Sequence, residues 1–495
     1  MLLGAAAGYG YVRWRIDSIK TVAAPHLTRD PPAGKVADSA GGLAPENILL
    51  IGNETRAGLT NPTQIAQLGS PQVYSGSLSD VIMILHLDPA KDTASILSIP
   101  RDLFVPMPPG SPVGAYQKID AALNDGANGP DNLIETITDD LGIPINHFVE
   151  LNFDGFESTV NALGGINVDF PERVFDAYSL LDITTPGCQH LDGAQALALV
   201  RARHLQYDPP GVPASDKAAW PYDPESDLSR IVRDHTFLRI LASTAKSEGL
   251  TNPFKANAFI GAVINQITMD PGLKNQLVSL VLHYRHLNPG TFPETTLPVT
   301  QVGGSSGYYY DGVDMGDVDF PVQPEDNSVI AAWSRSALPA PRPPAGVQVL
   351  NLAGTYDLAT RTASALASDG LRVVGVGDAQ VPADATETLV LYHPGDLAQA
   401  LDVFGHLSGA VMLQQDAAVA PGVIQVQAGS LLSVTAPPGA QPPGAPSTAP
   451  ASASTSTPAP GSGSVTGPTP GGQTASPAAD VVQPWDPRPC PAAKG

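Results

Sequence analysis

The sequence is poor in cysteine and in positive charge for its length of 495 residues. Its two cysteines, Cys188 and Cys490, stand in no Cys-x-x-Cys or Cys/His spacing, which excludes a zinc-finger type of site. The 26 basic residues stand against 48 acidic ones, giving a net charge of -22. Nonspecific affinity for nucleic acid or for an anionic membrane surface is therefore not expected. An anion site would have to be built from a few concentrated arginines.

Three signatures of large enzyme classes are also missing. The sequence contains no GxxxxGK[ST], no GxSxG and no GxGxxG placed between a strand and a helix. P-loop, hydrolase-elbow and Rossmann interpretations are excluded on this ground. The length predicts about two to four domains, because one hydrophobic core does not grow to this size.

The N-terminal run MLLGAAAGYGYVRWRI is apolar but short. Its apolar or small residues end before Arg13, whereas crossing a bilayer takes roughly 20 residues. Tyr9, Tyr11 and Trp14 are placed like an interfacial aromatic belt. We predict that residues 1–44 are the outer end of a single-pass membrane anchor and a linker, with the following domain outside the cell membrane. A poor signal peptide or a disordered start is the alternative.

Residues 45–335 predict a layered α-β-α domain. Short apolar runs alternate with amphipathic stretches, a pattern typical of an α/β core. The predicted strands are 47–51, 81–87 and 94–99, and the predicted helices are 131–141, 154–165, 192–200 and 227–249.

Three further segments follow. Residues 336–346 are proline-rich and predict a linker. Residues 347–436 repeat a smaller α/β pattern, with strands at 347–352, 371–376 and 388–392 and helices at 357–369 and 394–406. Residues 437–495 consist mainly of Pro, Ser, Thr, Ala and Gly. They predict a disordered tail, because such a composition buries too little apolar surface to offset chain entropy.

Arg101 and Asp102 directly follow a predicted strand, where Pro100 turns the chain out of the sheet. Ligands collect at the carboxyl ends of strands in open α/β sheets. A local surface ion pair is the alternative for these two residues.

Further arginines are concentrated in two stretches. Arg201 and Arg203 share one face if their segment is extended, and Arg230 and Arg233 lie in the first turns of the helix at 227–249, near its positive dipole end. The planar guanidinium fork suits phosphate oxygens. Scattered solvated arginines are the alternative.

Acidic residues accompany these arginines. Glu54 and Arg56 follow the strand at 47–51, and Asp80 precedes the strand at 81–87. Carboxylates beside phosphate commonly hold Mg²⁺. Together with the arginines they predict a metal-assisted pyrophosphate site, although each acid alone could be a cap or a surface residue.

These residues, in this order, resemble the LytR-CpsA-Psr family of cell-wall phosphotransferases. The resemblance spans about residues 45–289 and is carried by LLIGNETRAG, GSLSDVIMIL, LSIPRDLFV, KIDAALNDG, DGFESTVNALGGINV, LDGAQALALVRARH and DLSRIVRDH. Residues 347–435 resemble the LytR C-terminal domain. The family usually has Asp at the position of Glu54, Arg at that of Leu78 and Gln at that of Asp234. Leu78 removes a phosphate contact, and Asp234 would repel phosphate unless it meets Arg230 one turn away.

The resemblance implies a hydrophobic lipid groove and transfer of a glycopolymer from a polyprenyl-pyrophosphate carrier to peptidoglycan. Mg²⁺ or Mn²⁺ would be held by Glu54 and Asp80, and Arg101 with Asp102 would be catalytic. The pyrophosphate ligands implied are Arg56, Arg101, Lys118, Arg201, Arg203, Arg230 and Arg233. The composition and the second domain resemble actinobacterial members, and this resemblance implies arabinogalactan as the donor. Two alternatives are a catalytically weakened polyprenyl-glycan binding protein and a polyprenyl-diphosphate pyrophosphatase.

The two cysteines predict a disulfide. An extracytoplasmic domain lies in a compartment that permits one, and a bond between Cys188 and Cys490 would return the C-terminus to the catalytic domain. Unpaired thiols or an intermolecular bond are the alternatives, since the sequence supplies no geometry.

Overall fold

The structure is a computed structural model that describes residues 13–28, 44–54, 77–224, 227–249, 261, 263–264, 266–304, 307–310, 312–322, 325–334, 341–379, 387–434 and 482–491. The N-terminal residues 1–12, Arg56 and most of the predicted tail lie outside these residues. None of the helices in the described part of the chain is both long and apolar enough to cross a membrane.

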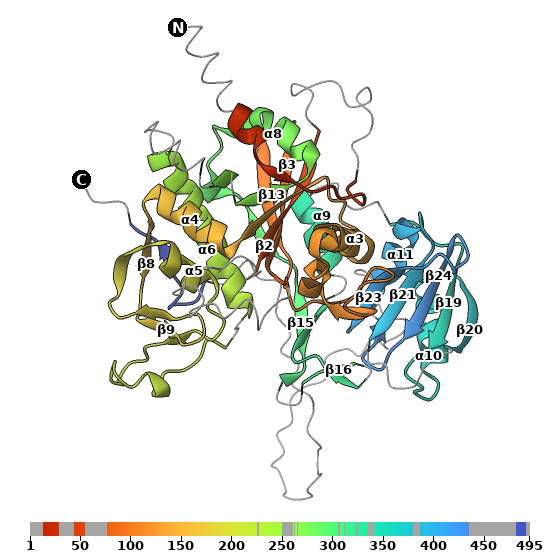
Figure 1. Cartoon of the computed structure of the whole chain (residues 1–495). Coiled ribbons are helices and arrows are strands. Elements are labelled where there is room, and N and C mark those ends of the chain that lie inside the picture. The colour runs from red at the N-terminus through yellow and green to blue at the C-terminus, as the bar shows by residue number, and fades with distance from the viewer. Residues whose placement is uncertain are drawn as a thin grey trace, which may run out of the picture.

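A seven-stranded mixed sheet forms the centre of the larger domain (Figure 1). Its strand order is β1 (Lys20–Thr21), β13 (Ile267–Met269), β7 (His147–Asn152), β2 (Glu46–Asn53), β3 (Ser79–Asp88), β4 (Thr93–Ser98) and β14 (Glu294–Thr296). The strands predicted at 47–51, 81–87 and 94–99 are thus confirmed as β2, β3 and β4. Since β3 runs antiparallel to β2 and β4, it begins at the sheet edge where both neighbours end.

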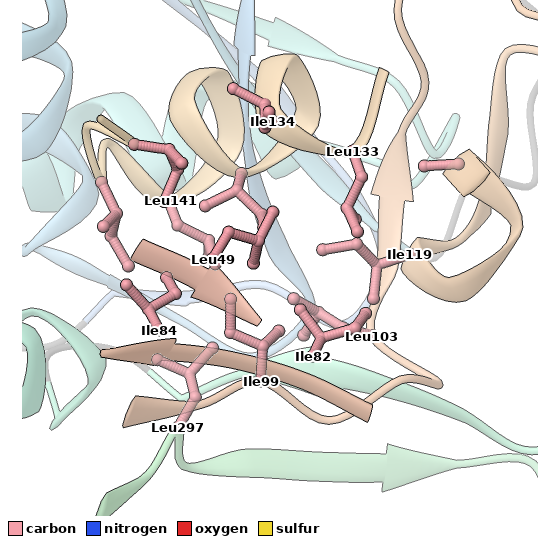
Figure 2. Close-up of a cluster of buried hydrophobic side chains, with 14 of the residues drawn as sticks. Leu49, Ile82, Ile84, Ile99, Leu103, Ile119, Leu133, Ile134, Leu141 and Leu297 are labelled. Atoms are coloured by element: carbon pink, nitrogen blue, oxygen red, sulfur yellow. The ribbon is translucent and has the colours of Figure 1, made fainter. Parts of the chain in front are cut away.

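Helices cover both faces of this sheet, which confirms the layered α-β-α prediction. On one face α3 (Gly129–Leu141) packs on side chains of β2, β3 and β4, as Figure 2 shows. On the other face lies α8 (Pro271–Tyr284). Alternation along β2 explains the layering, because Leu49 and Ile51 belong to the cluster under α3, whereas Ile48 belongs to the cluster under α8.

Three helices pack beside the sheet: α4 (Phe153–Leu163), α5 (Gly193–Val200) and α6 (Asp227–Thr244). The sequence predicted all three, and their ends follow local signals. Asn152 caps α4 and Gly164 ends it in the left-handed region, while Asp192 and Gln195 form a capping box at α5. The last predicted turn of α6, Ala245–Gly249, is a π-helical turn instead.

Two small sheets lie next to these helices. One contains β9 (Val174–Asp176), β10 (Leu181–Ile183) and β12 (Gln206–Tyr207). The other contains β8 (Ile166–Phe170), β11 (Gly187–Leu191) and β26 (Arg488–Pro489). The remaining elements of the larger domain include the hairpin β5 (Phe104–Pro106) and β6 (Tyr116–Lys118), the pair β15 (Val299–Val302) and β18 (Val318–Pro321), and α9 (Glu325–Ser334).

In its described residues, the second domain has a five-stranded sheet and two helices. Its strand order is β20 (Val373–Asp378), β19 (Gly346–Asn351), β24 (Val423–Ala428), β21 (Thr388–Tyr392) and β23 (Val411–Gln415), with α10 (Leu358–Ser368) and α11 (Leu397–Phe404). The strands and helices predicted between 347 and 406 are confirmed as β19, α10, β20, β21 and α11.

The two domains share a hydrophobic cluster. Phe104 of β5 and Phe320 of β18 belong to one buried group with Leu391 and Met412 of the second domain. The phenol of Tyr116 in β6 donates to Gln414 Oε1 at 2.9 Å. The hairpin that follows Arg101 and Asp102 is therefore packed directly against the second domain.

Residues 482–491 do not behave as the predicted tail. Strand β26 pairs with β8, and a disulfide joins Cys188 in β11 to Cys490, with the two Cα atoms 5.7 Å apart. Figure 1 shows this dark blue segment beside β8, across the molecule from the second domain. The tail prediction is wrong for these residues, because Trp485, Asp486 and Cys490 supply the contacts that the surrounding composition lacks.

Candidate functional site

Six of the predicted charged residues line one pocket of about 170 Å³ at the sheet edge where β2 and β4 end. Four arginines and two carboxylates line it, so positive charge is in excess. Tyr178, Ser179 and His204 complete the lining. The charged residues are Glu54, Asp80, Arg101, Arg201, Arg203 and Arg230.

Arg101 lies at the centre of this charge cluster. Pro100 ends the strand run, and the amide of Leu103 donates to its carbonyl, so the chain turns and places Arg101 over the start of β3. The guanidinium donates from Nη1 to Asp80 Oδ1. Arg101 is 9% exposed, so the alternative of a loose surface ion pair does not apply.

Asp102 holds the cations together from behind the pocket. Its carboxylate lies 2.8 Å from Lys118 Nζ, accepts from Arg203 Nη2 at 3.1 Å, and lies 3.7 Å from Arg101 Nε. Asp102 is 5% exposed and does not line the pocket. It and Lys118 therefore position the arginines, and neither is placed to touch a ligand in this pocket.

Asp120 lies behind the same cluster and was not predicted as a functional residue. Its amide donates to the carbonyl of Arg101 at 3.2 Å, and its side chain is buried. Burial raises the pKa of the Asp120 carboxyl to about 7, and the neighbouring Arg101 only partly offsets the effect of burial. The sequence around Asp120 offers one signal, because KIDAAL (residues 118–123) places this acid among apolar positions.

Arg201 and Arg203 reach the pocket from the end of α5. The helix stops at Val200, and both guanidinium groups line the same pocket. The segment is not extended as considered from the sequence, because Arg201 keeps a helical conformation and the chain then turns. Arg201 Nη2 lies 4.0 Å from Glu54 Oε1, and its guanidinium lies 4.9 Å from the centre of the Phe153 ring. Arg203 is held by Asp102.

The two arginines of α6 have different environments. Arg230 lines the pocket and donates to the carbonyl of Asp80 at 2.6 Å. Asp234 lies one turn on and 3.8 Å from Arg230, so the ion pair that would offset its repulsion of phosphate is present. Arg233 is 0% exposed and lies outside the pocket. The structure does not place Arg233 as a ligand of this pocket, because Asp223, Asp486 and the carbonyl of Ala202 hold its guanidinium.

Glu54 and Asp80 supply carboxylate oxygens of the kind that a hard divalent cation prefers. Both line the pocket, and the amide of Glu54 donates to Leu78 O at 2.8 Å, which sets the end of β2 against the start of β3. Mg²⁺ is usually held by one or two carboxylates together with substrate phosphates. Within the described ranges no group of three or more His, Cys, Asp or Glu residues could hold an ion without such help.

One wall of the pocket was not predicted from the sequence. Tyr178 and Ser179 lie in the tight loop between β9 and β10, and Tyr178 is 72% exposed. The buried carboxylate of Asp176 organises this loop, because it accepts from the amides of Tyr178, Ser179 and His204 at 2.8, 3.1 and 2.8 Å. Leu180 closes the loop with a φ of 64°, a conformation that costs energy for a leucine.

An apolar groove of about 240 Å³ adjoins the charged pocket. Asp80 and Arg201 line both, so the two are continuous. The groove runs between the sheet and helices α4, α5 and α6. Its apolar lining includes Leu50, Val81, Met83, Val149, Leu151, Phe153, Phe156, Leu197, Val200, Phe237, Leu238 and Ile267.

A larger cavity of about 630 Å³ lies at the opposite end of β4. Lys91 and Trp333 are part of its lining, and Lys91 is paired with Asp88. Among its described lining residues there is no arginine. The arginine pocket, and not this cavity, therefore has the charge to bind a diphosphate.

A family model described as the LytR_cpsA_psr family matches residues 28–319. The chain belongs to this family. A second model, described as LytR cell envelope-related transcriptional attenuator, matches residues 345–431. The second domain of this LytR-CpsA-Psr protein thus coincides with the LytR C-terminal model.

Relatives of the chain carry cell-wall names. It is 26% identical to the cell wall biosynthesis protein LcpA of Corynebacterium glutamicum, over 88% of this chain and 86% of LcpA. It is 34% identical to the probable cell wall biosynthesis protein LcpB of the same species, over 49% of this chain and 51% of LcpB. It is 41% identical to TagV of Bacillus subtilis, named a polyisoprenyl-teichoic acid–peptidoglycan teichoic acid transferase, over 25% of this chain and 32% of TagV.

Among solved structures, the chain is similar to a LytR-Csp2A-Psr enzyme from Actinomyces oris. The TM-score is 0.45 at 22% identity, covering 64% of this chain and 96% of that one.

Proposed function

We propose that this protein transfers a glycopolymer from a polyprenyl-pyrophosphate carrier to peptidoglycan and leaves a phosphodiester link. The observation that carries the proposal is the continuity of the arginine pocket with the apolar groove through Asp80 and Arg201. A polyprenyl pyrophosphate has the same two parts, because a charged diphosphate is joined to an apolar chain. Cell-wall transfer is also the activity named for TagV.

The arginines would bind the diphosphate and stabilise the charge that develops as it is cleaved. Arg201 lies where the groove meets the pocket. Arg101 and Arg230 both donate to Asp80. Arg203 is held at the pocket by its hydrogen bond to Asp102. Preorganised charge of this kind is usually the largest catalytic contribution. Burial of Arg101 and Arg230 strengthens it, because little water screens them.

Mg²⁺ or Mn²⁺ would be held by Glu54 and Asp80 together with oxygens of the diphosphate. When bound, the ion supplies a further positive charge to the phosphate oxygens. Glu54 retains this capacity where the family usually has Asp, since its longer side chain still ends in a carboxylate.

The transfer itself is a displacement at phosphorus. A hydroxyl oxygen of the peptidoglycan acceptor bonds to the phosphorus that carries the sugar, and the bridging P–O bond breaks. The electron pair of that bond leaves with the polyprenyl phosphate, and the hydroxyl proton is released to solvent. Arg101 would neutralise the leaving phosphate, and Asp102 would keep Arg101 oriented.

Tyr178 offers a place for the first sugar of the donor. Its ring is 72% exposed at the rim of the pocket, and the loop that carries it is fixed by Asp176. Exposed aromatic faces suit the C–H faces of sugar rings, since a large apolar ring loses little conformational entropy on contact.

The corynebacterial relatives are named for cell wall biosynthesis, and the name of TagV contains peptidoglycan, which is the proposed acceptor. Arabinogalactan remains the glycopolymer expected from the resemblance to actinobacterial members. In this proposal the catalytic domain lies outside the cell membrane and the N-terminal segment anchors it as a single span.

One incubation tests the proposal against its alternatives. Purified protein with Mg²⁺ is given a polyprenyl-pyrophosphate-linked sugar, with and without peptidoglycan. Polymer-linked peptidoglycan supports the transferase. Hydrolysis of the diphosphate without peptidoglycan would favour a pyrophosphatase. Tight binding of the donor without any reaction would favour a binding protein. The ion pair of Asp234 with Arg230 supports the transferase, because it offsets one of the two departures that suggested weakened activity.

A further inference from the structure

The segment 482–491 is attached to the catalytic domain by three different contacts. Strand β26 pairs with β8 through Arg488 opposite Asp169, and a disulfide links Cys490 to Cys188. The ring of Trp485 stacks on Tyr207 with 3.8 Å between centroids and 3° between planes. A segment held by a strand pair, a covalent bond and an aromatic stack has one fixed place on the domain.

Asp486 in this segment reaches Arg233 of α6. It is 1% exposed, and its Oδ1 lies 3.4 Å from Arg233 Nη1, while its Oδ2 accepts from the amide of Gln483 at 2.8 Å. The same Nη1 donates to Asp223 Oδ2 at 2.8 Å. Two carboxylates from distant parts of the chain thus fix one buried guanidinium.

Arg233 transmits this position to the pocket. Its Nη2 donates to the carbonyl of Ala202 at 2.6 Å. Ala202 lies between Arg201 and Arg203, both of which line the pocket. A shift of Arg233 would therefore move the backbone that carries two of the four pocket arginines.

The Trp485 stack reaches the opposite wall. Tyr207 belongs to β12, which pairs with β9, and β9 leads into the loop that carries Tyr178. The segment thus supports both the arginine wall and the Tyr178 wall of the pocket, although it does not line the pocket itself.

We propose that the segment 482–491 is a working part of the pyrophosphate site, with Asp486 as a positioning residue that holds Arg233 and, through it, Arg201 and Arg203. This inference rests on the proposed function, since it assigns the pocket a diphosphate ligand. Displacement of charged groups by about 1 Å can cost up to about 100-fold in rate. We therefore expect a loss of diphosphate affinity and of turnover of about tenfold or more when Asp486 loses its carboxylate.

The test uses the full chain and two probes. Farnesyl pyrophosphate reports on the pocket and the groove together, whereas farnesol reports on the groove alone. Asp486→Ala should weaken farnesyl pyrophosphate binding about tenfold in calorimetry and leave farnesol binding unchanged. Asp486→Asn, which keeps an oxygen acceptor for Arg233, should lose less. Val482→Ala is the matched control, because its side chain is in the same segment and 46% exposed.

Reduction of the disulfide provides a second route. The same selective loss of pyrophosphate affinity is expected for wild-type protein reduced under native conditions and for the Cys490→Ser variant. These two forms test the inference even if Asp486→Ala does not fold. If wild type binds farnesyl pyrophosphate and all these forms bind it equally well, the inference is overturned and the proposed function stands. A lower melting temperature with unchanged affinity would also overturn it, because the segment would then only add stability. Wild type that binds no pyrophosphate would overturn the proposed function itself.

Discussion

Replacing Asp120 by asparagine should stabilise the catalytic domain at neutral and alkaline pH. Asp120 is 5% exposed and lies near Arg101, Asp102, Lys118 and Asp80. Burial raises the pKa of its carboxyl from 3.8 to about 7. The folded state therefore keeps the proton up to a higher pH than the unfolded state does.

The sign and size of the effect follow from linkage. Between about pH 4 and pH 7 the unfolded chain releases this proton first, so the free energy of unfolding falls as the pH rises. One pKa unit corresponds to about 1.4 kcal/mol, so the raised pKa of Asp120 costs about 4 kcal/mol once the group is ionised in both states. Asparagine cannot ionise and has the shape of the protonated acid. Asp120→Asn should match wild type at about pH 4 and exceed its stability by up to about 4 kcal/mol at about pH 8.

Urea denaturation across this pH range, with a chelator present, measures the difference. All four tryptophans lie outside the second domain, so their fluorescence reports on the rest of the chain. Asp182→Asn is the matched control, because Asp182 is a carboxylate with 45% of its side chain exposed. The reasoning is refuted if Asp120→Asn is no more stable than wild type at about pH 8, or if the control shows the same gain.

Four further changes address the pocket. Arg101→Ala should lower kcat about 10²–10³-fold; wild-type turnover in a folded variant would exclude its catalytic role. Asp80→Ala should weaken Mg²⁺ binding in calorimetry, and an unchanged affinity would place the metal elsewhere. Replacement of Arg201 and Arg203, singly and together, should give a coupling energy for farnesyl pyrophosphate of about 0.5 kcal/mol or more, whereas strict additivity would mean separate ligands. Tyr178→Ala should raise the KM of a glycosylated donor and leave farnesyl pyrophosphate affinity unchanged; an equal loss for both would contradict a sugar contact.

Most of the fold follows from periodicity and local signals. The runs that became β2, β3 and β4 are apolar because helices cover both faces of the sheet. The capping box of Asp192 and the left-handed Gly164 set helix ends as their sequence signals indicated. The convergence of the arginines could also be inferred, because they follow strand and helix ends that meet at one edge of the sheet.

The parts that sequence could not give depend on distant contacts. Arg230 and Arg233 are three residues apart on one helix and carry the same charge. Both are buried, but Arg230 lines the pocket, whereas Asp223, Asp486 and the carbonyl of Ala202 hold Arg233 outside it. The Tyr178 wall was missed because β9 and β10 are three-residue strands without a periodic signal.

The prediction of a disordered tail from composition failed because the composition was averaged over too long a segment. The proline-rich and serine-rich character of residues 437–495 is real. It does not describe residues 482–491, in which a few side chains decide the structure. Trp485 stacks on an aromatic ring, Asp486 pairs with a buried arginine, and Cys490 forms a disulfide. None of the three partners lies nearby in the sequence.

The pairing of β26 with β8 sets an order for biosynthesis. A ribosome makes β8 and Cys188 long before it reaches Cys490, 302 residues further along the chain. Until then β8 has an open edge on the side that β26 later covers, and Arg233 has only the nearer of its two carboxylates. Open strand edges invite pairing with other chains. A nascent or prematurely terminated chain would therefore lack the last strand of this sheet and expose an edge that is prone to aggregation. Completion of the catalytic domain thus depends on synthesis of the whole chain.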